Sequence, residues 1–310
     1  MGEKIFADLH NHTTASDGDF SPEKMVTKAK AMGISAVGIT DHDTIKGLYE
    51  ALEAGRKYPI EVVPGVEISI KFKCSFFTGT LHLLCYFLPE LLYSKAFIKE
   101  LETTLSKGRG KNLVKARVKE INRFFGPHGK TPILVKNITF KEIAVYSSNA
   151  TRRHFTMALN KNHHIENMDV INRIIGNNSP AYLPSGIYLD TAKVFLEKFP
   201  VISVLAHPAA GSFPGKGHYN EVLPPIEVVE RLLPEFIDAG LKGLEINYPG
   251  HIQQHRDILS AWAEKYRLIA TGGSDCHDAI NRVPGVEGIT EKEFTAFKRI
   301  LIKTHKHHTL

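Results

Sequence analysis

Short hydrophobic runs rich in β-branched residues alternate with stretches of helical periodicity along most of the chain. Seven such runs stand out, at residues 5–10, 36–40, 61–63, 81–87, 201–206, 243–247 and 268–271. Strands that alternate with helices are typical of βα units and a mainly parallel sheet. Because seven strands suffice for a barrel, the pattern predicts an α/β barrel.

Local capping signals mark two of the helices between these strands. Ser21 can cap a helix that has Pro22 in its first turn, and Gly33 ends that helical pattern. Thr290 and Glu293 have the spacing of a capping box, which predicts a last helix running to about residue 303. These signals are structural and need no functional explanation.

The strand rhythm stops between residues 94 and 199. Helical periodicity covers residues 99–125, 140–146, 151–161 and 169–175, with Gly and Pro turns between them. A structureless loop of this length is not expected inside a compact protein. We therefore predict a barrel made of residues 1–93 and 200–310, which carries the chemistry, and an inserted helical subdomain at residues 94–199 that binds substrate.

Composition and charge restrict the class of protein without defining its function. The chain has 310 residues, of which 43% are hydrophobic, and 39 Lys and Arg against 33 Asp and Glu give a net charge of +6. The chain has no run of five or six basic residues that would predict a nucleic-acid arm. Three widely spaced cysteines predict neither a disulfide framework nor a structural zinc site. The hydrophobic run at residues 81–92 is too short to span a bilayer, so we expect a cytoplasmic protein that does not associate with membranes.

Histidines and carboxylates gather where the predicted strands end. Two imidazoles close the first strand, and further candidate ligands follow the second, third, fifth and last; they are His10, His12, His42, Glu67, His207, Asp275 and His277. In a parallel α/β barrel these points share the face on which active sites are built. Unrelated turn residues would have to produce that coincidence five times, so a shared site is favoured.

Two further residues are weaker candidates on their own. His82 begins its predicted strand instead of ending it, and Asp17 lies in a turn seven residues after His10. With them the set has nine members, whereas one catalytic zinc takes about three protein ligands. Nine candidates predict two or three ions with at least one bridging carboxylate, and mixed imidazole and carboxylate donors suit Mn, Zn or Fe.

Taken in order, these motifs resemble the PHP (polymerase and histidinol phosphatase) superfamily of metal-dependent phosphoesterases. The resemblance rests on Asp-Leu-His-Asn-His at 8–12, Thr-Asp-His-Asp-Thr at 40–44, Pro-Gly-Val-Glu at 64–67, Ala-His-Pro at 206–208 and Gly-Ser-Asp-Cys-His at 273–277. It implies a distorted seven-stranded (β/α) barrel with three ions. By motif, the first ion would be held by His10, His12, Glu67 and Asp275, the second by Glu67, His82 and His207, and the third by Asp17, His42 and His277.

One branch of that superfamily is favoured by two more features. Residues 243–251 and the Arg-Arg-His sequence at 152–154 resemble the nucleotide-bisphosphate phosphatases and related 5′-to-3′ exoribonucleases, although that branch usually has Arg-Pro-His. The substrate-binding candidates are Arg109, Lys111, Asn112, Arg152, Arg153, His154, Tyr248 and His251. Solvated helix surface is an equally good interpretation of the basic residues, and a role in closing the barrel is as good for Tyr248 and His251.

Two acidic residues beside the ligand motifs have open interpretations. Asp8 or Asp43 could orient a ligand imidazole, which is the usual way in which a histidine tautomer is fixed. For Asp43, capping a helix that begins near residue 44 is at least as good.

The leading hypothesis is a phosphatase for nucleoside 3′,5′-bisphosphates, or an enzyme that trims 5′-phosphorylated oligoribonucleotides by the same chemistry. The expected nucleophile is a metal-bound hydroxide held by Glu67, His10, His12 and Asp275, with two or three divalent ions, Mn before Zn or Fe. The expected partner is a phosphorylated small molecule or short oligonucleotide, without a stable nucleic-acid complex.

Three alternatives stay open at this point. A histidinol-phosphate type phosphomonoesterase would need no receptor for a second phosphate. A non-catalytic PHP binding module is disfavoured by the intact ligand set. A metal-dependent amidohydrolase would share the His-x-His start of residues 10–12 but would not explain residues 40–43.

Overall fold

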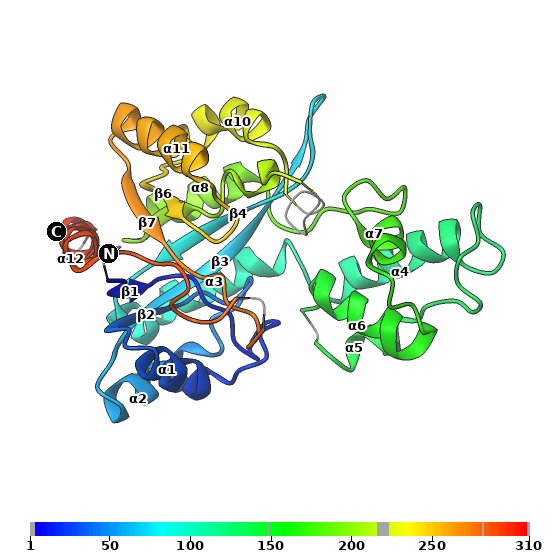
Figure 1. Ribbon diagram of the computed structural model, residues 1–310, viewed down its shortest axis with the longest axis horizontal. Helices are drawn as coiled ribbons and strands as arrows, with labels where there is room; N and C mark the ends of the chain where they lie inside the picture. Colours follow the sequence, from blue (N-terminus) through cyan, green and yellow to red (C-terminus); the bar gives the residue numbers. More distant parts are fainter. Residues whose placement is uncertain (1–3, 148, 216–222, 281, 309–310) are drawn as a thin grey trace.

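The computed structural model describes residues 4–147, 149–215, 223–280 and 282–308. Figure 1 shows two lobes, a large one that contains the sheet and a smaller helical one joined to it at one side. No helix within the described part of the chain is both long and apolar enough to cross a membrane.

The sheet has seven strands whose spatial order is their sequence order. They are β1 (Ala7–Asp8), β2 (Ala36–Ile39), β3 (Glu61–Lys73), β4 (Thr78–Tyr86), β5 (Ile202–Leu205), β6 (Gly243–Asn247) and β7 (Ile269–Gly272). Neighbours are parallel except that β4 is antiparallel to both β3 and β5. The N–H of Leu9 donates to the carbonyl of Gly272 at 3.1 Å, which nearly closes the barrel. The predicted α/β barrel is confirmed.

The direction of β4 explains why His82, which begins its predicted strand, still belongs to the cluster. Parallel strands end at the site face, but an antiparallel strand begins there, so His82 lies at the same level as residues that close their strands. The prediction for the preceding strand was too short. β3 continues from Glu61 to Lys73 because β4 pairs with it along the whole stretch from Gly65 to Lys73, so Glu67 lies inside β3 and does not follow it.

Helices cover the barrel, and the predicted caps are present. Before helix α1 (Pro22–Ala31), the Ser21 hydroxyl accepts from the N–H of Lys24. Helix α12 (Glu291–His308) begins after Thr290, which forms the capping box with Glu293 in the first turn. The other elements packed on the barrel are α2 (Leu48–Lys57), η1 (Pro89–Tyr93), α3 (Lys95–Ser106), α8 (Leu189–Lys198), η2 (Ala210–Ser212), α10 (Ile226–Asp238) and α11 (Gln253–Tyr266).

The smaller lobe contains α4 (Lys111–Phe125), α5 (Phe140–Ala144), α6 (Arg152–His163) and α7 (Met168–Ile175). The expectation of a single helix at residues 99–125 is wrong. The structure has two helices there, α3 and α4, and they are separated at Gly110, which has a φ of +101°. The lobe has its own hydrophobic core, which includes Ile121 and Phe155. Phe97 of α3 and Phe195 of α8 pack in the barrel core instead, so the limits 94–199 for the inserted subdomain stay a prediction.

Candidate metal centre and substrate cavity

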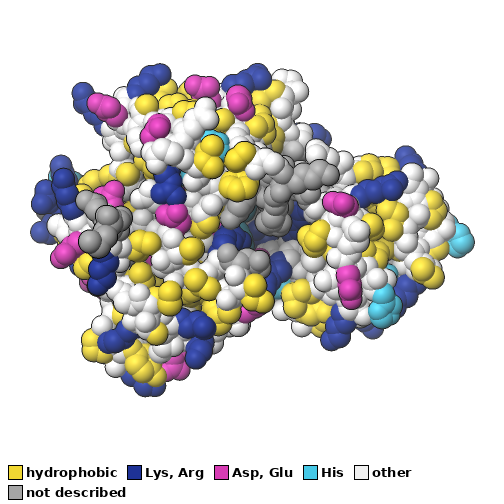
Figure 2. Space-filling model, viewed as in Figure 1, with side chains coloured by type: hydrophobic (Ala, Val, Ile, Leu, Met, Phe, Trp, Pro, Cys, Tyr) yellow, Lys and Arg dark blue, Asp and Glu magenta, His cyan; other side chains and the backbone are white. Residues whose placement is uncertain are grey.

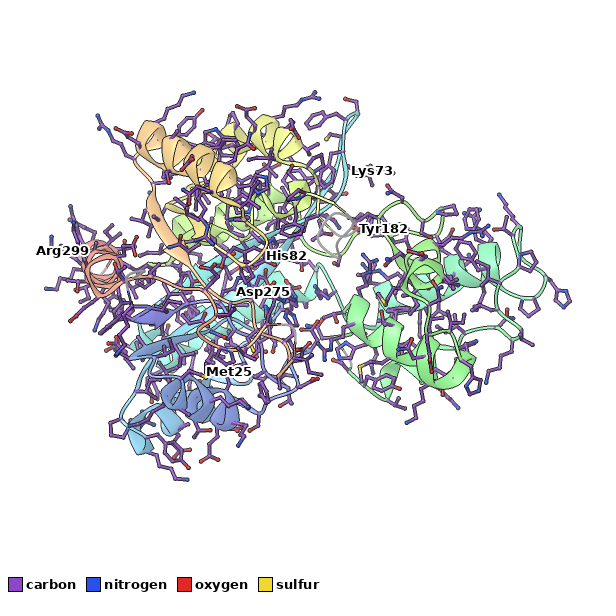
Figure 3. The ribbon with its side chains drawn as sticks, in the orientation of Figure 1. Met25, Lys73, His82, Tyr182, Asp275 and Arg299 are labelled. Atoms are coloured by element: carbon purple, nitrogen blue, oxygen red, sulfur yellow. The ribbon has the colours of Figure 1, made fainter. Side chains whose placement is uncertain are left out.

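All nine predicted ligands lie in one cluster at the end of the barrel that faces the smaller lobe. Figure 3 marks the cluster through the labels of His82 and Asp275. Seven of the nine side chains are buried, and only His82 and His277 are half-buried. Buried charged groups are costly unless they are paired or bind a metal ion. The buried carboxylates and imidazoles of this cluster therefore need either one another or a bound cation as partners.

Glu67 occupies the middle of the cluster, and its two oxygens face different imidazoles, with Nε2 of His10 also 3.5 Å from Oε2. Oε2 lies 3.1 Å from Nε2 of His12 and 2.9 Å from Nδ1 of His42. Oε1 lies 3.0 Å from Nδ1 of His82 and 3.2 Å from Nε2 of His207. Oε2 is buried and makes no hydrogen bond to any described group. A carboxylate in this position has the geometry of a bridging ligand.

A second carboxylate, Asp275, completes the group around the first strand. Its Oδ1 lies 3.5 Å from Nε2 of His10 and 3.1 Å from Nε2 of His12, and the two imidazole nitrogens are 3.1 Å apart. Two imidazole nitrogens at this distance need a proton or a cation between them. The donor atoms therefore fit a cation held by these residues and Glu67.

A third group adjoins this one. Atoms of His12, Asp17, His42 and His277 that could serve as metal ligands all lie within 4.8 Å of one another. Oδ1 of Asp17 lies 3.5 Å from Nε2 of His277. The structure thus places His12 between the first and third groups, whereas the motif resemblance gave it to the first alone.

The electrostatics of the cluster favour positive charge. Burial lowers the pKa of His12, but Asp275 and Glu67 outweigh burial and raise it to about 9. Burial raises the pKa of Glu67, but His42 and His82 hold it well below its usual range. The carboxylates thus stay ionised and draw cations toward the imidazoles, so the histidine and acid clusters are suited to binding divalent metal ions.

Two residues that sequence reasoning missed support the cluster. Oε1 of Glu245 lies 2.9 Å from Nδ1 of His10, and its Oε2 accepts from the N–H of His207 at 2.7 Å. Arg282 contacts Asp275, and one of its nitrogens lies 3.3 Å from Nδ1 of His277. Glu245 could have been found as a carboxylate inside the hydrophobic strand at 243–247, but no local signal marks Arg282.

The two acidic residues with open interpretations orient backbone and basic groups. Asp8 accepts from the N–H and hydroxyl of Ser274 and from the N–H of Gly285. Asp43 accepts from the N–H and hydroxyl of Ser69 and pairs with Arg109. The expectation that either one orients an imidazole is wrong, and so is the expectation that Asp43 caps a helix, because α2 begins after Gly47 without a side-chain cap.

A cavity of about 810 Å³ separates the cluster from the smaller lobe. One wall is the histidine and carboxylate cluster, and the opposite wall consists of residues from α4, α6, α7 and the stretch 177–185 that follows α7, among them Arg117, Phe155 and Tyr182. Figure 2 shows basic side chains in the hollow between the lobes, and Figure 3 labels Tyr182 there. A substrate in this cavity would contact both lobes.

Four of the predicted substrate-binding residues line this cavity. They are Arg109, Arg152, Arg153 and Tyr248. Tyr248 also donates to Oδ2 of Asp275 at 2.9 Å, so it supports the cluster as well. Arg117, which sequence reasoning missed, lines the cavity too and donates twice to the carbonyl of Leu183, at 2.9 and 2.7 Å.

The other four predicted substrate residues do not line the cavity. Lys111 and Asn112 are exposed on the first turn of α4. His154 is buried and accepts from the N–H of Thr151, so it caps α6. His251 is buried with both ring nitrogens engaged, one accepting from the N–H of Ala209 and the other donating to the carbonyl of Ile246. These hydrogen bonds support a structural role for both histidines, through both ring nitrogens of His251 and through Nδ1 of His154.

Comparison with known proteins places the chain in a family. Residues 8–172 match the model of the PHP domain, which covers more than half of the chain. The chain therefore belongs to the PHP domain family.

Several curated relatives match over most of their length. A 5′-3′ exoribonuclease from Haemophilus influenzae is 28% identical over 87% of this chain and 89% of the relative. A phosphoribosyl 1,2-cyclic phosphate 1,2-diphosphodiesterase from Eggerthella lenta is 27% identical over 91% and 98%. A 3′,5′-nucleoside bisphosphate phosphatase from Chromobacterium violaceum is 24% identical over 87% and 86%.

The fold is shared with solved structures. A protein from Bifidobacterium adolescentis, described as a presumed metal-dependent phosphoesterase, superposes with a TM-score of 0.73 and covers 96% of this chain and 98% of its own, at 23% identity. Family, relatives and cluster together show that the chain is a hydrolase that acts on phosphoesters.

Proposed function

We propose that this chain removes a phosphate from nucleoside 3′,5′-bisphosphates, or trims short 5′-phosphorylated oligoribonucleotides by the same chemistry. The observation that carries the proposal is one cavity with the metal cluster on one wall and arginines on the other. A substrate with two phosphates can place one on each wall. The names of the relatives from Haemophilus influenzae and Chromobacterium violaceum support the same substrate class.

The metal ions would be held by the three groups of the cluster. His10, His12, Glu67 and Asp275 would bind the first, and Glu67, His82 and His207 the second. Asp17, His42 and His277 would bind the third, with His12 beside them. When bound, divalent ions of this kind polarise a phosphoryl group and lower the pKa of a coordinated water. Mn before Zn or Fe is our proposal for the metal, from the mixed nitrogen and oxygen donors.

The arginines of the far wall would bind the second phosphate. Arg117 is fixed by its two hydrogen bonds to Leu183, and although burial lowers its pKa to about 10, it keeps its charge at neutral pH. Arg152 donates to Oδ1 of Asn172 at 2.5 Å, which holds it at the start of α6. A planar guanidinium that is already oriented loses little freedom when it binds a phosphate.

Part of the remaining lining of the cavity is apolar and suits the nucleoside. Phe155 of α6 and Ile174 of α7 line the space beside the arginines, together with Met168. A base and ribose placed there would bury apolar surface, at roughly 25 cal/mol per Å² removed from water. A histidinol-phosphate type substrate has a single phosphate and would offer the far arginines no second phosphate to bind, which favours the bisphosphate reading.

A phosphate-release screen with Mn tests the proposal. The substrates are nucleoside monophosphates, 3′,5′-bisphosphates, short 5′-phosphorylated RNAs, a phosphoribosyl 1,2-cyclic phosphate and histidinol phosphate. We expect kcat/KM to be highest for a bisphosphate or a short RNA. A preference for histidinol phosphate or for the cyclic phosphate would overturn the proposal.

A further inference from the structure

The third ligand group consists of Asp17, His42 and His277, and the residues next to these ligands make contacts outside the barrel. Each of its three proposed ligands has a neighbour in sequence that contacts a residue of the 94–199 segment. Asp19, two residues after Asp17, pairs with Arg153 of α6 at 2.7 Å. Asp278, which follows His277, lies 3.7 Å from the other terminal nitrogen of Arg153.

The ligand segment of His42 is also connected to the smaller lobe or to its base. Asp43 pairs with Arg109, which lies between α3 and α4. The side-chain amide of Asn149, just before α6, donates to the carbonyl of His42 at 3.4 Å. All three ligand segments of the third group are therefore connected to residues of the 94–199 segment.

The first two groups receive side-chain support from within the barrel, although residues of the 94–199 segment also contact their strands: Arg109 donates to the hydroxyl of Ser69 at 2.8 Å, and the hydroxyl of Thr80 donates to the carbonyl of Ser185 at 2.9 Å. Glu245 of β6 holds both His10 and the backbone of His207. Tyr248, just after β6, donates to Asp275. Their ligand side chains are thus held through the sheet, whereas the ion pairs of Arg153 connect the segments of Asp17 and His277 in the third group to α6.

Two crossings of the chain connect the smaller lobe to the barrel. The two chain crossings lie side by side, because the N–H of Gly186 donates to the carbonyl of Gly108 at 2.8 Å. Gly110 and Gly186 have φ values of +101° and +110°, in the region that favours glycine. Figure 1 shows the lobe at one side of the barrel, and Arg153 of the lobe pairs with Asp19 of the barrel. Contacts across the cavity, such as those of Arg153, therefore contribute to where the lobe rests.

We propose that Arg153 is a positioning residue for the third ion, and that binding of that ion is coupled to seating of the smaller lobe over the cavity. The inference rests on the proposed function, because it takes Asp17, His42 and His277 as ligands. One guanidinium holds the segments of two of these ligands, which lowers the conformational entropy that an ion must remove on binding. Coupling is reciprocal, so the third ion also favours the seated lobe.

The test is calorimetric titration of Mn²⁺ into metal-free protein, with the bound ions counted by elemental analysis. The variants are Arg153→Gln, Asp19→Asn and the double variant, with Arg123→Gln as the matched control. Arg123 lies on α4 of the same lobe and pairs only locally with Glu120 among the described residues. A thermal melt of each metal-free protein checks that the fold is unchanged.

We expect the wild type to bind three ions, with the third the weakest. Partly exposed ion pairs contribute up to about 1 kcal/mol each, so Arg153→Gln should weaken the third ion by about three- to tenfold and leave the other two unchanged. Asp19→Asn should weaken binding of the third ion less, because Arg153 keeps its contact with Asp278. The double variant should bind the third ion as well as Arg153→Gln alone does, because Arg153→Gln already removes the contact with Asp19.

Two results would overturn the inference in distinguishable ways. Three ions with unchanged affinities in Arg153→Gln would remove the positioning role while leaving the proposed ligands intact. A wild type that saturates at two ions or fewer would remove the third site itself, and with it that part of the proposed function. An equal loss at all three sites would show a general effect on the fold and would also contradict the inference.

Discussion

The carboxylate of Glu245 lies 2.9 Å from Nδ1 of His10 and, through its other oxygen, accepts from the backbone N–H of His207 at 2.7 Å. One fully buried side chain thus orients a proposed ligand of the first ion and the segment that carries a proposed ligand of the second. Carboxylates that hold a ligand histidine by its other ring nitrogen fix the tautomer and raise its basicity.

Replacing Glu245 should therefore weaken metal binding without touching a ligand. We expect Glu245→Gln to lower the affinity for Mn²⁺ by about ten- to a hundredfold, the range found for such supporting residues. Calorimetric titration measures it, and Glu61→Gln, on the exposed start of β3, is the control. Unchanged affinity in Glu245→Gln would show that the His10 contact does not matter for the ions.

Asp275 is expected to be indispensable as a ligand. Its Oδ1 faces three imidazoles and its Oδ2 is held by Tyr248, so Asp275→Asn removes the anionic oxygen while keeping the shape. The variant should lose turnover and bind less metal while its circular dichroism stays that of the wild type. Full activity with unchanged metal content by elemental analysis would contradict the assignment.

Turnover should require more than one ion, because nine candidate ligands exceed the capacity of one site. Protein treated with EDTA should be inactive and recover on addition of Mn²⁺, with two or three ions per chain. Low occupancy of the group at Asp17, His42 and His277 would leave two ions as the stable complement. Saturating activity with a single bound equivalent would rule out the multinuclear centre.

Arg152 should discriminate between substrates. A hydrogen bond to a charged group contributes roughly 1.5–3 kcal/mol, and each 1.4 kcal/mol is about tenfold in rate. Arg152→Ala should lower kcat/KM for a 3′,5′-bisphosphate about ten- to a hundredfold. An aryl phosphate, which has only the reacting phosphate, should be nearly unaffected.

The matched control for this experiment is Arg123→Ala on the exposed face of α4. Equal losses on both substrates would mean that Arg152 supports the reacting phosphate or the fold. No loss on either would make it solvated helix surface and would move the histidinol-phosphate type reading ahead.

The metal-free protein should lose stability as pH rises above neutrality. His12 has its pKa raised from 6.5 to about 9, because Asp275 and Glu67 outweigh the opposing effect of burial. A raised histidine pKa stabilises the fold fully below about pH 6.5, and this stabilisation is lost as pH rises through about 9. The loss is up to about 3 kcal/mol for this group. Denaturant unfolding of metal-free protein at pH 6 and 9 measures it.

The same protonation gives a second observable. Binding of Mn²⁺ below about pH 9 must displace the proton from His12, so affinity should fall as pH falls. Proton release in buffers of different ionisation enthalpy would detect this exchange. Affinity that does not change between pH 6 and 9 would show that His12 is not a ligand.

The local sequence carried most of the information on the cluster. A histidine or carboxylate that follows a strand of a parallel barrel can face only one end of it, so the motifs at 10–12, 42, 207 and 275–277 were brought together without knowledge of long-range contacts. Helix caps such as Ser21 and Thr290 were equally predictable, since their partners lie three residues away.

The tertiary structure decided what depends on partners far apart in the chain. His10 and Glu245 are 235 residues apart, and Asp43 and Arg109 are 66 apart, so no local period predicts either contact. The direction of β4 followed from a hairpin with β3 that extends both strands beyond their hydrophobic pattern. His154 and His251 look the same in sequence as ligands, and only the packing, which engages Nδ1 of His154 and both ring nitrogens of His251, gives them a structural role. Side-chain type and strand period are local properties, whereas the partner of a buried polar group is fixed by the whole fold.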